Sequence, residues 1–466
     1  MREQPYFIAF LAKFLLFFAE SFFFFTLCCA ILKNNYDAKR KNSCVGGAGP
    51  AGENNLPPGL AFLYQQYRRN FMHYQFSKKI DSLQPSAIRE ILKATADPSV
   101  ISFAAGNPAP EAFPIEAVQK ITREILEENP ILALQYSVTE GHQPLRDRLV
   151  HLVKERYGIG RDFDQVLVVS GAQQGICLTA HCLLDDGDKV ISESPSFIGS
   201  LNAFRSFRSQ LVGVEMGPDG IDTEKLEQAL KANPNTKFIY TIPNFQNPTG
   251  ITMSLEKRKE VYRLALQYGV LILEDNPYGE LRFSGEDVPT IKSMDTEGIV
   301  IYCGSFSKVL SPGLRVGYVV APKEIIAKLT VAKQSSDVHT TILSQLICDR
   351  FLAEYDFDAH IAGLREIYRK KSSLMIRQID QQFHPAVAHT NPEGGLFLWC
   401  TLPKGSDMLA FCKAAVEQRV AVVPGTAFLT DDKGTSESVR LNFSTPTDEQ
   451  IVEGINRLGA LTKKMF

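Results

Sequence analysis

The stretch that decides the fold lies at residues 165–174 and reads Gln165-Val166-Leu167-Val168-Val169-Ser170-Gly171-Ala172-Gln173-Gln174. Its first half is apolar on both faces, which predicts a buried strand. A glycine follows, and residues 172–184 carry a helical pattern. A buried strand that leads through a glycine into a helix is typical of α/β folds.

Similar runs recur along the chain. Further strands are predicted at residues 189–192, 237–241, 270–274, 299–303 and 315–320, with helical patterns between many of them, as at 254–268. Because these runs are apolar on both faces and separated by helices, we predict a mostly parallel sheet sandwiched by helices. From about residue 344, a long polar helix and short strands at 396–399 and 438–441 predict a second, smaller α+β domain.

The composition favours a globular protein that acts on small molecules. Of the 466 residues, 44% are hydrophobic and 22% charged, and the formal net charge is -2. A balance so close to neutral gives no electrostatic reason to expect nucleic acid as a partner. The nine cysteines and eight histidines show no metal-binding spacing. We therefore expect free thiols in a reducing compartment, no metal site and a cytoplasmic location.

The N-terminus does not match this pattern. Residues 6–32 are strongly apolar, although Lys13 and Glu20 interrupt them, and a Gly-rich linker follows. The run is long enough for a membrane anchor, whereas a signal peptide is disfavoured because no small-residue cleavage site follows. The preferred interpretation is that residues 1–71 are an extension foreign to the natural protein and that Met72 is the true start.

Polar residues that follow the predicted strands are the candidates for chemistry, because ligands of open α/β sheets bind at the carboxyl ends of the strands. Lys308 follows the strand at 299–303. It is flanked by Ser305 and Ser307, and Arg315 lies seven residues on. The simplest alternative is an exposed lysine in an ordinary loop, but other strand ends favour a site.

One of these strand ends carries Asp275, directly after the strand at 270–274, where an unpaired carboxylate would be costly. A pyridinium N–H would pair with it, and a protonated ring nitrogen makes such a ring an electron sink. Tyr278 and Asn247, in Asn247-Pro248-Thr249-Gly250, are candidates to donate to a phenolate oxygen on the same ring.

Three further positions complete the predicted site. Gly171 opens the helix at 172–184, whose free N–H groups and positive dipole end suit a phosphate. The hydroxyls and the guanidinium around Lys308 would complete this phosphate cup. Phe197 is a candidate to stack on the ring, and Arg440 to clamp a substrate α-carboxylate.

Taken together, these motifs resemble the class I/II aminotransferases of pyridoxal-phosphate fold type I. The matching elements are Gly171-Ala172-Gln173, Asn247-Pro248-Thr249-Gly250, Asp275 with Tyr278, Ser305-Phe306-Ser307-Lys308 with Arg315, and Arg440. The resemblance covers about residues 76–466. Motifs at residues 85–90, 106–114 and 135–141 are similar to the 2-aminoadipate, kynurenine and aromatic aminotransferase branch.

The resemblance implies a division into domains. A large pyridoxal-phosphate domain, residues 116–335, would carry a sheet of the seven-stranded type. A smaller α+β domain would draw on both ends of the chain, with residues 72–115 forming an N-terminal arm and part of it, and residues 336–466 the rest.

The resemblance also implies roles for single residues. Lys308 would hold the cofactor as a Schiff base and act as general acid and base, with Asp275 and Tyr278 as the other catalytic residues. Asn247 and Arg440 would bind substrate, and Arg89 would lie near the substrate side chain, where it could meet a distal carboxylate.

The remaining implied roles concern the cofactor phosphate. Ala172 and Gln173 would contact it, although many relatives have Ser at the position of Ala172, so one hydroxyl contact is lost here. Tyr136 would reach the phosphate of the neighbouring subunit, which implies a homodimer.

The implied reaction moves an amino group from an acidic, aromatic or 2-aminoadipate-like amino acid to a 2-oxo acid such as 2-oxoglutarate, by a ping-pong mechanism. A lyase or decarboxylase on the same fold is an alternative, because one fold hosts several chemistries. A transcription regulator with an aminotransferase-like domain is another. It would need a basic helical N-terminal segment, whereas residues 1–71 are Phe-rich and then Gly-rich.

Overall fold

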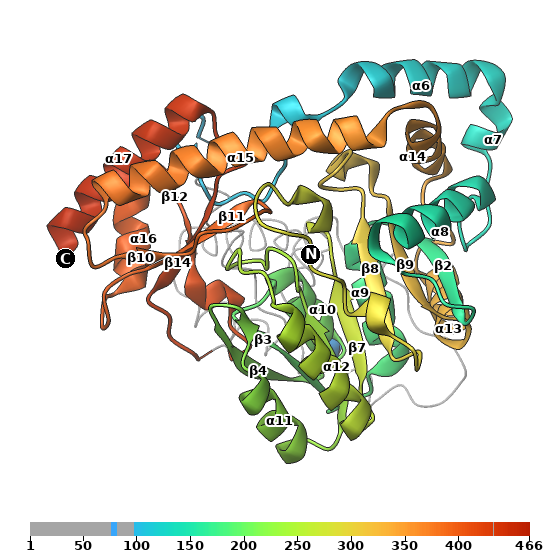
Figure 1. The fold of residues 1–466 in the computed structure, drawn as a ribbon, viewed down its shortest axis with the longest axis horizontal. Coiled ribbons are helices and arrows are strands. Elements are labelled where there is room, and N and C mark those ends of the chain that lie inside the picture. The colour runs from blue at the N-terminus through green and yellow to red at the C-terminus, as the bar shows by residue number, and fades with distance from the viewer. Residues whose placement is uncertain (1–75, 82–96, 432) are drawn as a thin grey trace, which may run out of the picture. The chain divides into compact units, whose positions relative to one another are not determined.

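The computed structural model describes residues 76–81, 97–431 and 433–466, which belong to one compact unit, Phe76–Phe466 (Figure 1). The extension predicted at residues 1–71 and the candidate Arg89 lie outside the described residues. Among the described helices, none is both long enough and apolar enough to cross a membrane.

A mostly parallel sheet of eight strands forms the centre of this unit, in the order β2-β9-β8-β7-β6-β3-β4-β5. Strand β9 runs antiparallel to both neighbours, and the edge strand β5 is antiparallel to β4. The strands are β2 Asp164–Val169, β3 Lys189–Ser194, β4 Gln210–Gly217, β5 Gly220–Ile221, β6 Thr236–Thr241, β7 Leu271–Asp275, β8 Val300–Ser305 and β9 Gly317–Pro322. The predicted α/β fold is confirmed, and the two-residue β5 adds an edge strand to the seven expected.

Burial on both faces of the sheet explains the continuous apolar runs. In β3, Val190 packs into one hydrophobic core and its neighbour Ile191 into another; in β7, Leu273 and Ile272 divide in the same way. The first core includes side chains of α9 and α10, and the second those of α11 and α12. These helices are α9 Ala172–Leu183, α10 Ile198–Ser206, α11 Thr223–Ala232 and α12 Leu255–Tyr268.

Further helices pack around the β2 edge of the sheet. Helices α8 and α13 pack against β2, and α14 packs against α6, α7 and α8. Their bounds are α6 Ile115–Glu128, α7 Pro130–Leu134, α8 Gln143–Tyr157, α13 Lys323–Ser336 and α14 Ile342–Glu354. In Figure 1 they lie on the side of the sheet opposite the C-terminal helices.

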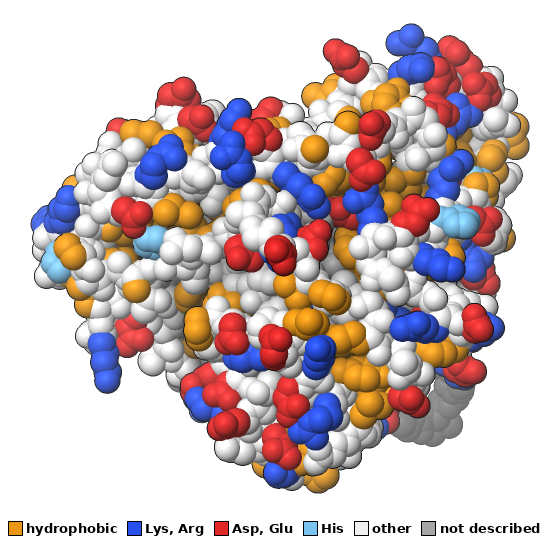
Figure 2. All heavy atoms as spheres, in the orientation of Figure 1, with side chains coloured by type: hydrophobic (Ala, Val, Ile, Leu, Met, Phe, Trp, Pro, Cys, Tyr) orange, Lys and Arg blue, Asp and Glu red, His pale blue; other side chains and the backbone are white. Residues whose placement is uncertain are grey.

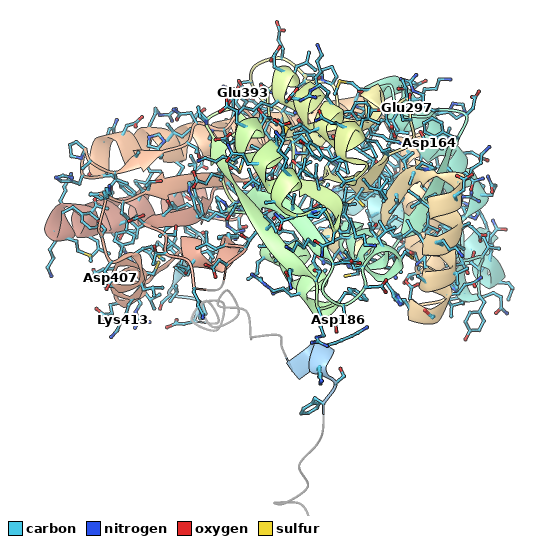
Figure 3. All side chains as sticks on the ribbon, turned by 90° about the horizontal axis from the view of Figure 1, so that it is seen from below. Asp164, Asp186, Glu297, Glu393, Asp407 and Lys413 are labelled. Carbon is cyan, nitrogen blue, oxygen red and sulfur yellow. The ribbon has the colours of Figure 1, made fainter. Side chains whose placement is uncertain are left out.

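A smaller α+β part contains an antiparallel sheet in the order β10-β11-β14-β13 and a parallel pair, β1 with β12. Its elements are β1 Ile101–Ser102, β10 Ala388–His389, β11 Phe397–Thr401, β12 Val420–Ala421, β13 Val423–Pro424, β14 Ser438–Asn442, α15 Phe357–Gln382, α16 Met408–Glu417 and α17 Asp448–Met465. Because β1 pairs with β12, residues from both ends of the described chain build this part, as predicted. Figure 3 labels Asp407 and Lys413 on it, and Asp164 and Asp186 on the part built around the large sheet. The precise domain boundaries stay predictions.

Short helices complete the fold: α4 Lys78–Asp81, η2 Pro110–Ala112, η3 Gly279–Leu281, η4 Lys292–Met294, η5 Pro312–Leu314 and η6 Gly425–Phe428. On the face drawn in Figure 2, basic and acidic side chains are interspersed, in keeping with the small net charge. The six described cysteines are free thiols. No group of three or more metal-ligating side chains gathers within the described residues.

Besides the short strands such as β5, two strands of the large sheet differ from the sequence prediction. Strand β9 begins at Gly317 and not at Arg315, because Arg315 has a φ of 53° and leaves the extended conformation. Strand β4 is not predicted from the sequence, because its residues are mostly exposed or half-buried and form no buried apolar run. It extends the sheet beyond β3.

Candidate active site

The candidate site lies where parallel strands β6, β7 and β8 end at the same edge of the sheet. Their registers pair Thr241 with Glu274 and Asp275 with Cys303. The loops that follow carry Asn247 after β6 and Lys308 after β8. Parallel pairing therefore brings together residues that are far apart in the chain.

Lys308 is half-buried in this region, and its Nζ donates to the carbonyl oxygen of Gly106 at 2.7 Å. Burial, followed by the positive charges of Arg440 and Arg315, lowers the pKa of Lys308 to about 8. At neutral pH a useful fraction of this amine is therefore uncharged and nucleophilic.

Asp275 ends β7 and is 2% exposed. The Tyr240 hydroxyl donates to Oδ2 at 2.8 Å, whereas Oδ1 is buried and has no partner. Burial in the first place, reinforced by the carboxylate of Glu193, raises the pKa of Asp275 to about 7. A buried carboxylate oxygen without a donor is the environment that a cationic ring nitrogen would satisfy.

Arg440, on β14, is buried beside this edge. Its Nη1 donates to Asn247 Oδ1 at 2.9 Å and its Nη2 to the Ala104 carbonyl at 2.7 Å, whereas Nε is buried without a partner. The guanidinium carbon lies 4.3 Å from the ring centroid of Phe397 and 5.0 Å from that of Phe428. Burial lowers the pKa of Arg440 to about 10, which leaves it charged at neutral pH. The unpartnered donor is suited to an anion.

Tyr278 joins this group through Asn247, whose Nδ2 donates to the Tyr278 hydroxyl at 3.5 Å. Burial raises the pKa of this hydroxyl, so it stays protonated and can donate. Arg440, Asn247 and Tyr278 thus form one chain of contacts.

The other end of the site is the start of α9, where Gly171 has a φ of 81° and no side chain caps the helix. Arg315 Nη2 donates to the Ser170 carbonyl at 3.0 Å. A Cβ on Gly171 would lie 2.4 Å from that nitrogen and would displace the guanidinium, and the positive φ also favours glycine. Ser307 N donates to Ser305 Oγ at 3.1 Å in the adjoining turn. The Arg315 guanidinium therefore contacts the residue that precedes the helix start, and the phosphate cup itself stays a prediction.

Two more predicted residues lie against Gly199, close to the start of α10. Gln173 Nε2 donates to the Gly199 carbonyl at 3.0 Å. A Cβ on Gly199 would meet the Phe197 ring at 2.6 Å and Gln173 Oε1 at 2.8 Å. The side chains of Phe197 and Gln173 are therefore neighbours, and Ala172 begins the same helix as Gln173.

Tyr136 differs from the other candidates. It is 81% exposed, and its ring lies 5.9 Å from that of His339 in an edge-on arrangement. Arg89 lies outside the described residues, so its predicted role near the substrate stays a prediction.

Sequence reasoning missed a buried carboxylate at the end of β3. Glu193 is 0% exposed and accepts from Ile242 N and Gln246 Nε2, both at 3.2 Å, and from the Thr241 hydroxyl. Gln246 Nε2 also donates to the Pro195 carbonyl at 2.8 Å. Glu193 therefore ties the loop that carries Phe197 to the loop that carries Asn247. The sequence pattern at Glu193, a carboxylate directly after a predicted apolar strand, is the same pattern that predicts Asp275.

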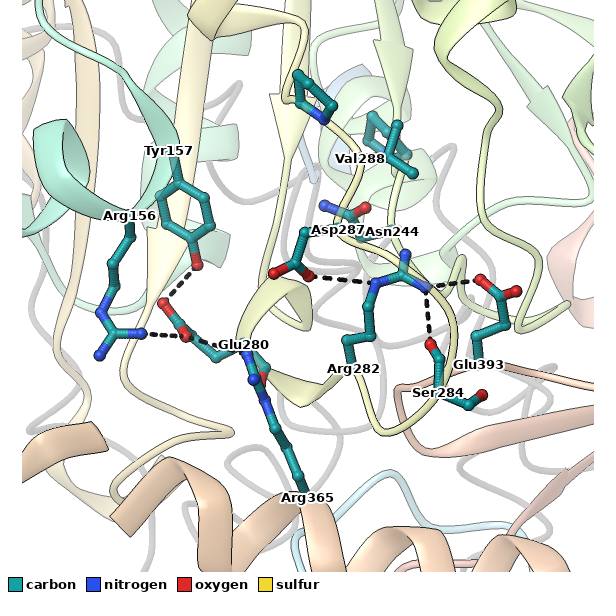
Figure 4. Close-up of polar contacts among 12 residues, drawn as sticks. Arg156, Tyr157, Asn244, Glu280, Arg282, Ser284, Asp287, Val288, Arg365 and Glu393 are labelled. Atoms are coloured by element: carbon teal, nitrogen blue, oxygen red, sulfur yellow. Dashed lines mark hydrogen bonds and ion pairs between the residues drawn. The ribbon is translucent and has the colours of Figure 1, made fainter. Parts of the chain in front are cut away.

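A separate cavity of about 360 Å³ is lined by Arg282, Phe283, Ser284, Gly285, Asp287, Ala362, Arg365, Glu366 and Arg369. Figure 4 shows the contacts of two of its basic side chains, Arg282 and Arg365, although Arg282 Nη2 is buried without a partner. Arg282 pairs with Glu393 at 2.6 Å and Asp287 at 3.3 Å, and Arg365 Nε donates to the Glu280 carbonyl at 2.8 Å. None of the candidate residues above lines this cavity, so it is not the predicted site.

Comparisons with known proteins agree with this geometry. Residues 98–458 match the family model for aminotransferase class I and II. The chain is 41% identical over 393 residues to aromatic-amino-acid aminotransferase 1 of Thermococcus litoralis, covering 84% of this chain and 94% of that protein. It is 40% identical over 394 residues to 2-aminoadipate transaminase of Thermus thermophilus, covering 84% and 97%.

A solved structure gives the same result. The crystal structure of Pyrococcus horikoshii kynurenine aminotransferase in complex with PMP has a TM-score of 0.81 and 37% identity, covering 85% of this chain and 98% of that chain. The chain therefore belongs to the class I and II aminotransferase family. It is a transaminase that depends on pyridoxal phosphate, and its orphaned Asp275 oxygen, glycine-opened helix and low-pKa lysine fit that cofactor.

Proposed function

We propose that this enzyme transfers the amino group of an acidic, aromatic or 2-aminoadipate-like L-amino acid to a 2-oxo acid such as 2-oxoglutarate. The observation that carries the proposal is the shared anchoring of Lys308 and Arg440. They donate to the carbonyls of Gly106 and Ala104, two residues apart in one segment. A nucleophilic amine and a carboxylate-binding guanidinium therefore face one small volume, as an α-amino acid requires.

The residues divide the work of the reaction. When bound, pyridoxal phosphate supplies an electron-withdrawing ring that acidifies the α-carbon of the amino acid. Lys308 would remove the proton from that carbon and return it at C4′, the former aldehyde carbon of the cofactor. Asp275 Oδ1 would keep the ring nitrogen protonated, and Asn247 and Tyr278 would donate to the ring oxygen. Arg440 Nε orients the substrate carboxylate.

The phosphate group is held at the opposite end of the site. The backbone N–H groups of Ala172 and Gln173, at the start of α9, face the anion with the positive end of the helix dipole. Ser305, Ser307 and Arg315 add hydroxyl and guanidinium donors. Phe197 would stack on the ring.

The substrate class rests on the relatives and on Arg89. The Thermococcus litoralis relative is named for aromatic amino acids and the Thermus thermophilus relative for 2-aminoadipate. Arg89 would meet a distal carboxylate. A screen of amino donors against 2-oxoglutarate tests this, with glutamate as the measured product. Release of ammonia or loss of the donor side chain would instead indicate a lyase.

A ping-pong cycle is tested with one substrate at a time. An amino donor alone should convert the bound cofactor to its amine form and release one equivalent of 2-oxo acid per site. A 2-oxo acid added afterwards should restore the starting absorption. A requirement for both substrates before any product appears would exclude the cycle.

The enzyme acts as a homodimer in this proposal, with Tyr136 serving the phosphate of the partner subunit. Tyr136 and two side chains of α7, Ile131 and Leu134, are 81%, 75% and 74% exposed, which favours a covered interface. Hybrid dimers of Lys308→Ala and Tyr136→Phe subunits test the arrangement. One of the two sites would then regain both native residues, so activity should return to about half. Activity no higher than that of the parents would place Tyr136 in its own subunit's site.

A further inference from the structure

We propose that Lys333 and Asp337 are positioning residues that hold the phosphate-binding start of α9 in shape. This inference rests on the phosphate role proposed for that helix start. Lys333 lies in the last turn of α13 and Asp337 directly follows that helix. Neither residue belongs to the predicted site.

Lys333 is a buried cation with every donor engaged. The residue is 0% exposed. Its Nζ contacts Asp337 Oδ1 and Oδ2 at 2.8 and 2.9 Å, Gln174 Oε1 at 2.9 Å and Thr340 Oγ1 at 3.1 Å. Its partner Asp337 is half-buried. An ion pair with one fully buried member is weak evidence for stability, because desolvation offsets the attraction, and it is best explained where it specifies a geometry.

The geometry that it specifies is that of Ser170, the residue before Gly171. Ser170 N donates to Gln174 Oε1 at 2.7 Å, and Ser170 Oγ donates to Asp337 Oδ2 at 2.7 Å. The Ser170 carbonyl accepts from Arg315 Nη2 at 3.0 Å. All three polar groups of Ser170 are therefore held, two of them by atoms that Lys333 binds.

The consequence concerns the phosphate cup. The N–H groups of α9 bind an anion only if the turn at Ser170 and Gly171 aims them, and Arg315 is anchored on the same residue. Lys333 and Asp337 neutralise each other, so they act through this turn and not through a long-range field. Their loss should weaken recognition of the phosphate and spare the rest of the cofactor.

The experiment compares the affinity of the cofactor-free enzyme for pyridoxal 5′-phosphate and for pyridoxal, which lacks the phosphate. Lys333→Met, Asp337→Asn and Ser170→Ala should each lower the affinity for the phosphate form by on the order of tenfold, the worth of a hydrogen bond to a charged group. The affinity for pyridoxal should change by less than about twofold.

Lys292→Met is the matched control. Lys292 is also buried and pairs with Asp164 at 2.7 Å and Asp295 at 2.9 Å. Asp164 begins β2, whose opposite end leads to Ser170, roughly 20 Å away for a strand of this length. This variant should lose stability but keep the wild-type ratio of the two affinities.

The inference is wrong if the Lys333 and Asp337 variants keep the wild-type ratio of the affinities for pyridoxal 5′-phosphate and pyridoxal, whether both affinities are unchanged or both fall equally. Where a charge variant does not fold, Ser170→Ala decides, because it removes only one hydroxyl. A wild-type enzyme with no preference for the phosphate form would instead overturn the proposed phosphate cup itself.

Discussion

At the scale of single residues, the site is marked by polar atoms that its own chain leaves unpaired. Asp275 Oδ1 and Arg440 Nε are both buried without a partner. Each such atom costs about 1–3 kcal/mol when nothing binds it. One is an acceptor and the other a donor, so together they indicate a ligand with a cation at one end and an anion at the other.

The first prediction concerns Asp275→Asn in the cofactor-free enzyme. Burial raises the pKa of Asp275 from 3.8 to about 7. Between these two pH values, the carboxyl is therefore protonated in the folded protein and ionised in the unfolded chain. The contribution of Asp275 to stability therefore falls as the pH rises from about 4 to about 7. Above pH 7, Asp275→Asn should be more stable than the wild type, by on the order of a few kcal/mol.

Thermal unfolding between pH 4 and 8 checks this. The advantage of the variant should vanish near pH 4, where the carboxyl is neutral, and added cofactor should stabilise the wild type more than the variant. Turnover should fall by about a hundredfold or more, as for the loss of a preorganised charge. Equal unfolding temperatures at all pH values would contradict the buried, unpaired carboxylate.

The second prediction concerns Lys308 in the cofactor-free enzyme. An amine-selective reagent attacks only the neutral amine, so labelling of Lys308 should rise with pH and reach half its maximum near pH 8. Arg440→Met removes a neighbouring positive charge and should move this midpoint to higher pH. Peptide mass spectrometry after timed labelling measures both. A wild-type midpoint near the ordinary value of 10.5 would contradict the prediction.

At the scale of elements, much of the candidate site can be predicted from the sequence, because the functional side chains come directly after the ends of strands. Apolar runs that end in Asp275 or precede Lys308 are local patterns, and parallel pairing brings their ends to one edge. The contact of Arg440 with Asn247 is not local, because the two are 193 residues apart. No periodicity within one segment contains it, and the resemblance to a family implies only that both residues bind substrate.

The third prediction concerns the start of α9. Gly171→Ala should destabilise the protein by about 1–3 kcal/mol because residue 171 has a positive φ. It should also weaken cofactor binding, because the new Cβ would lie 2.4 Å from Arg315 Nη2 and would push the guanidinium away. Gly187→Ala is the control, since Gly187 has a φ of 88° and nothing within 4 Å of an added Cβ.

Urea unfolding and cofactor titration separate the two effects. Both variants should lose stability, and only Gly171→Ala should bind pyridoxal phosphate more weakly. Unchanged cofactor affinity in Gly171→Ala would mean that the helix start and Arg315 do not form the phosphate cup.

At the scale of the whole molecule, the fourth prediction concerns assembly. Leu134→Glu places a charge on an exposed apolar helix and should shift the enzyme from dimers to monomers and reduce activity several-fold. Leu409→Glu, on α16, is the control, because Leu409 is 59% exposed but lies outside the proposed interface. Sedimentation at several concentrations measures the mass. Stable Leu134→Glu dimers would place the interface elsewhere.

The pairing of β1 with β12 has a consequence for synthesis on the ribosome. Residue 101 lies beside residue 420, and the Ala104 carbonyl meets a guanidinium 336 positions later. The residues proposed to hold the coenzyme and to shape its phosphate site, from Tyr136 to Asp337, are all translated before the C-terminal tail. The proposed binding site for the amino acid is complete only when β14, Ser438–Asn442, has left the exit tunnel, because this strand carries Arg440. A polypeptide that ends before this strand would therefore lack Arg440 and the substrate contact proposed for it.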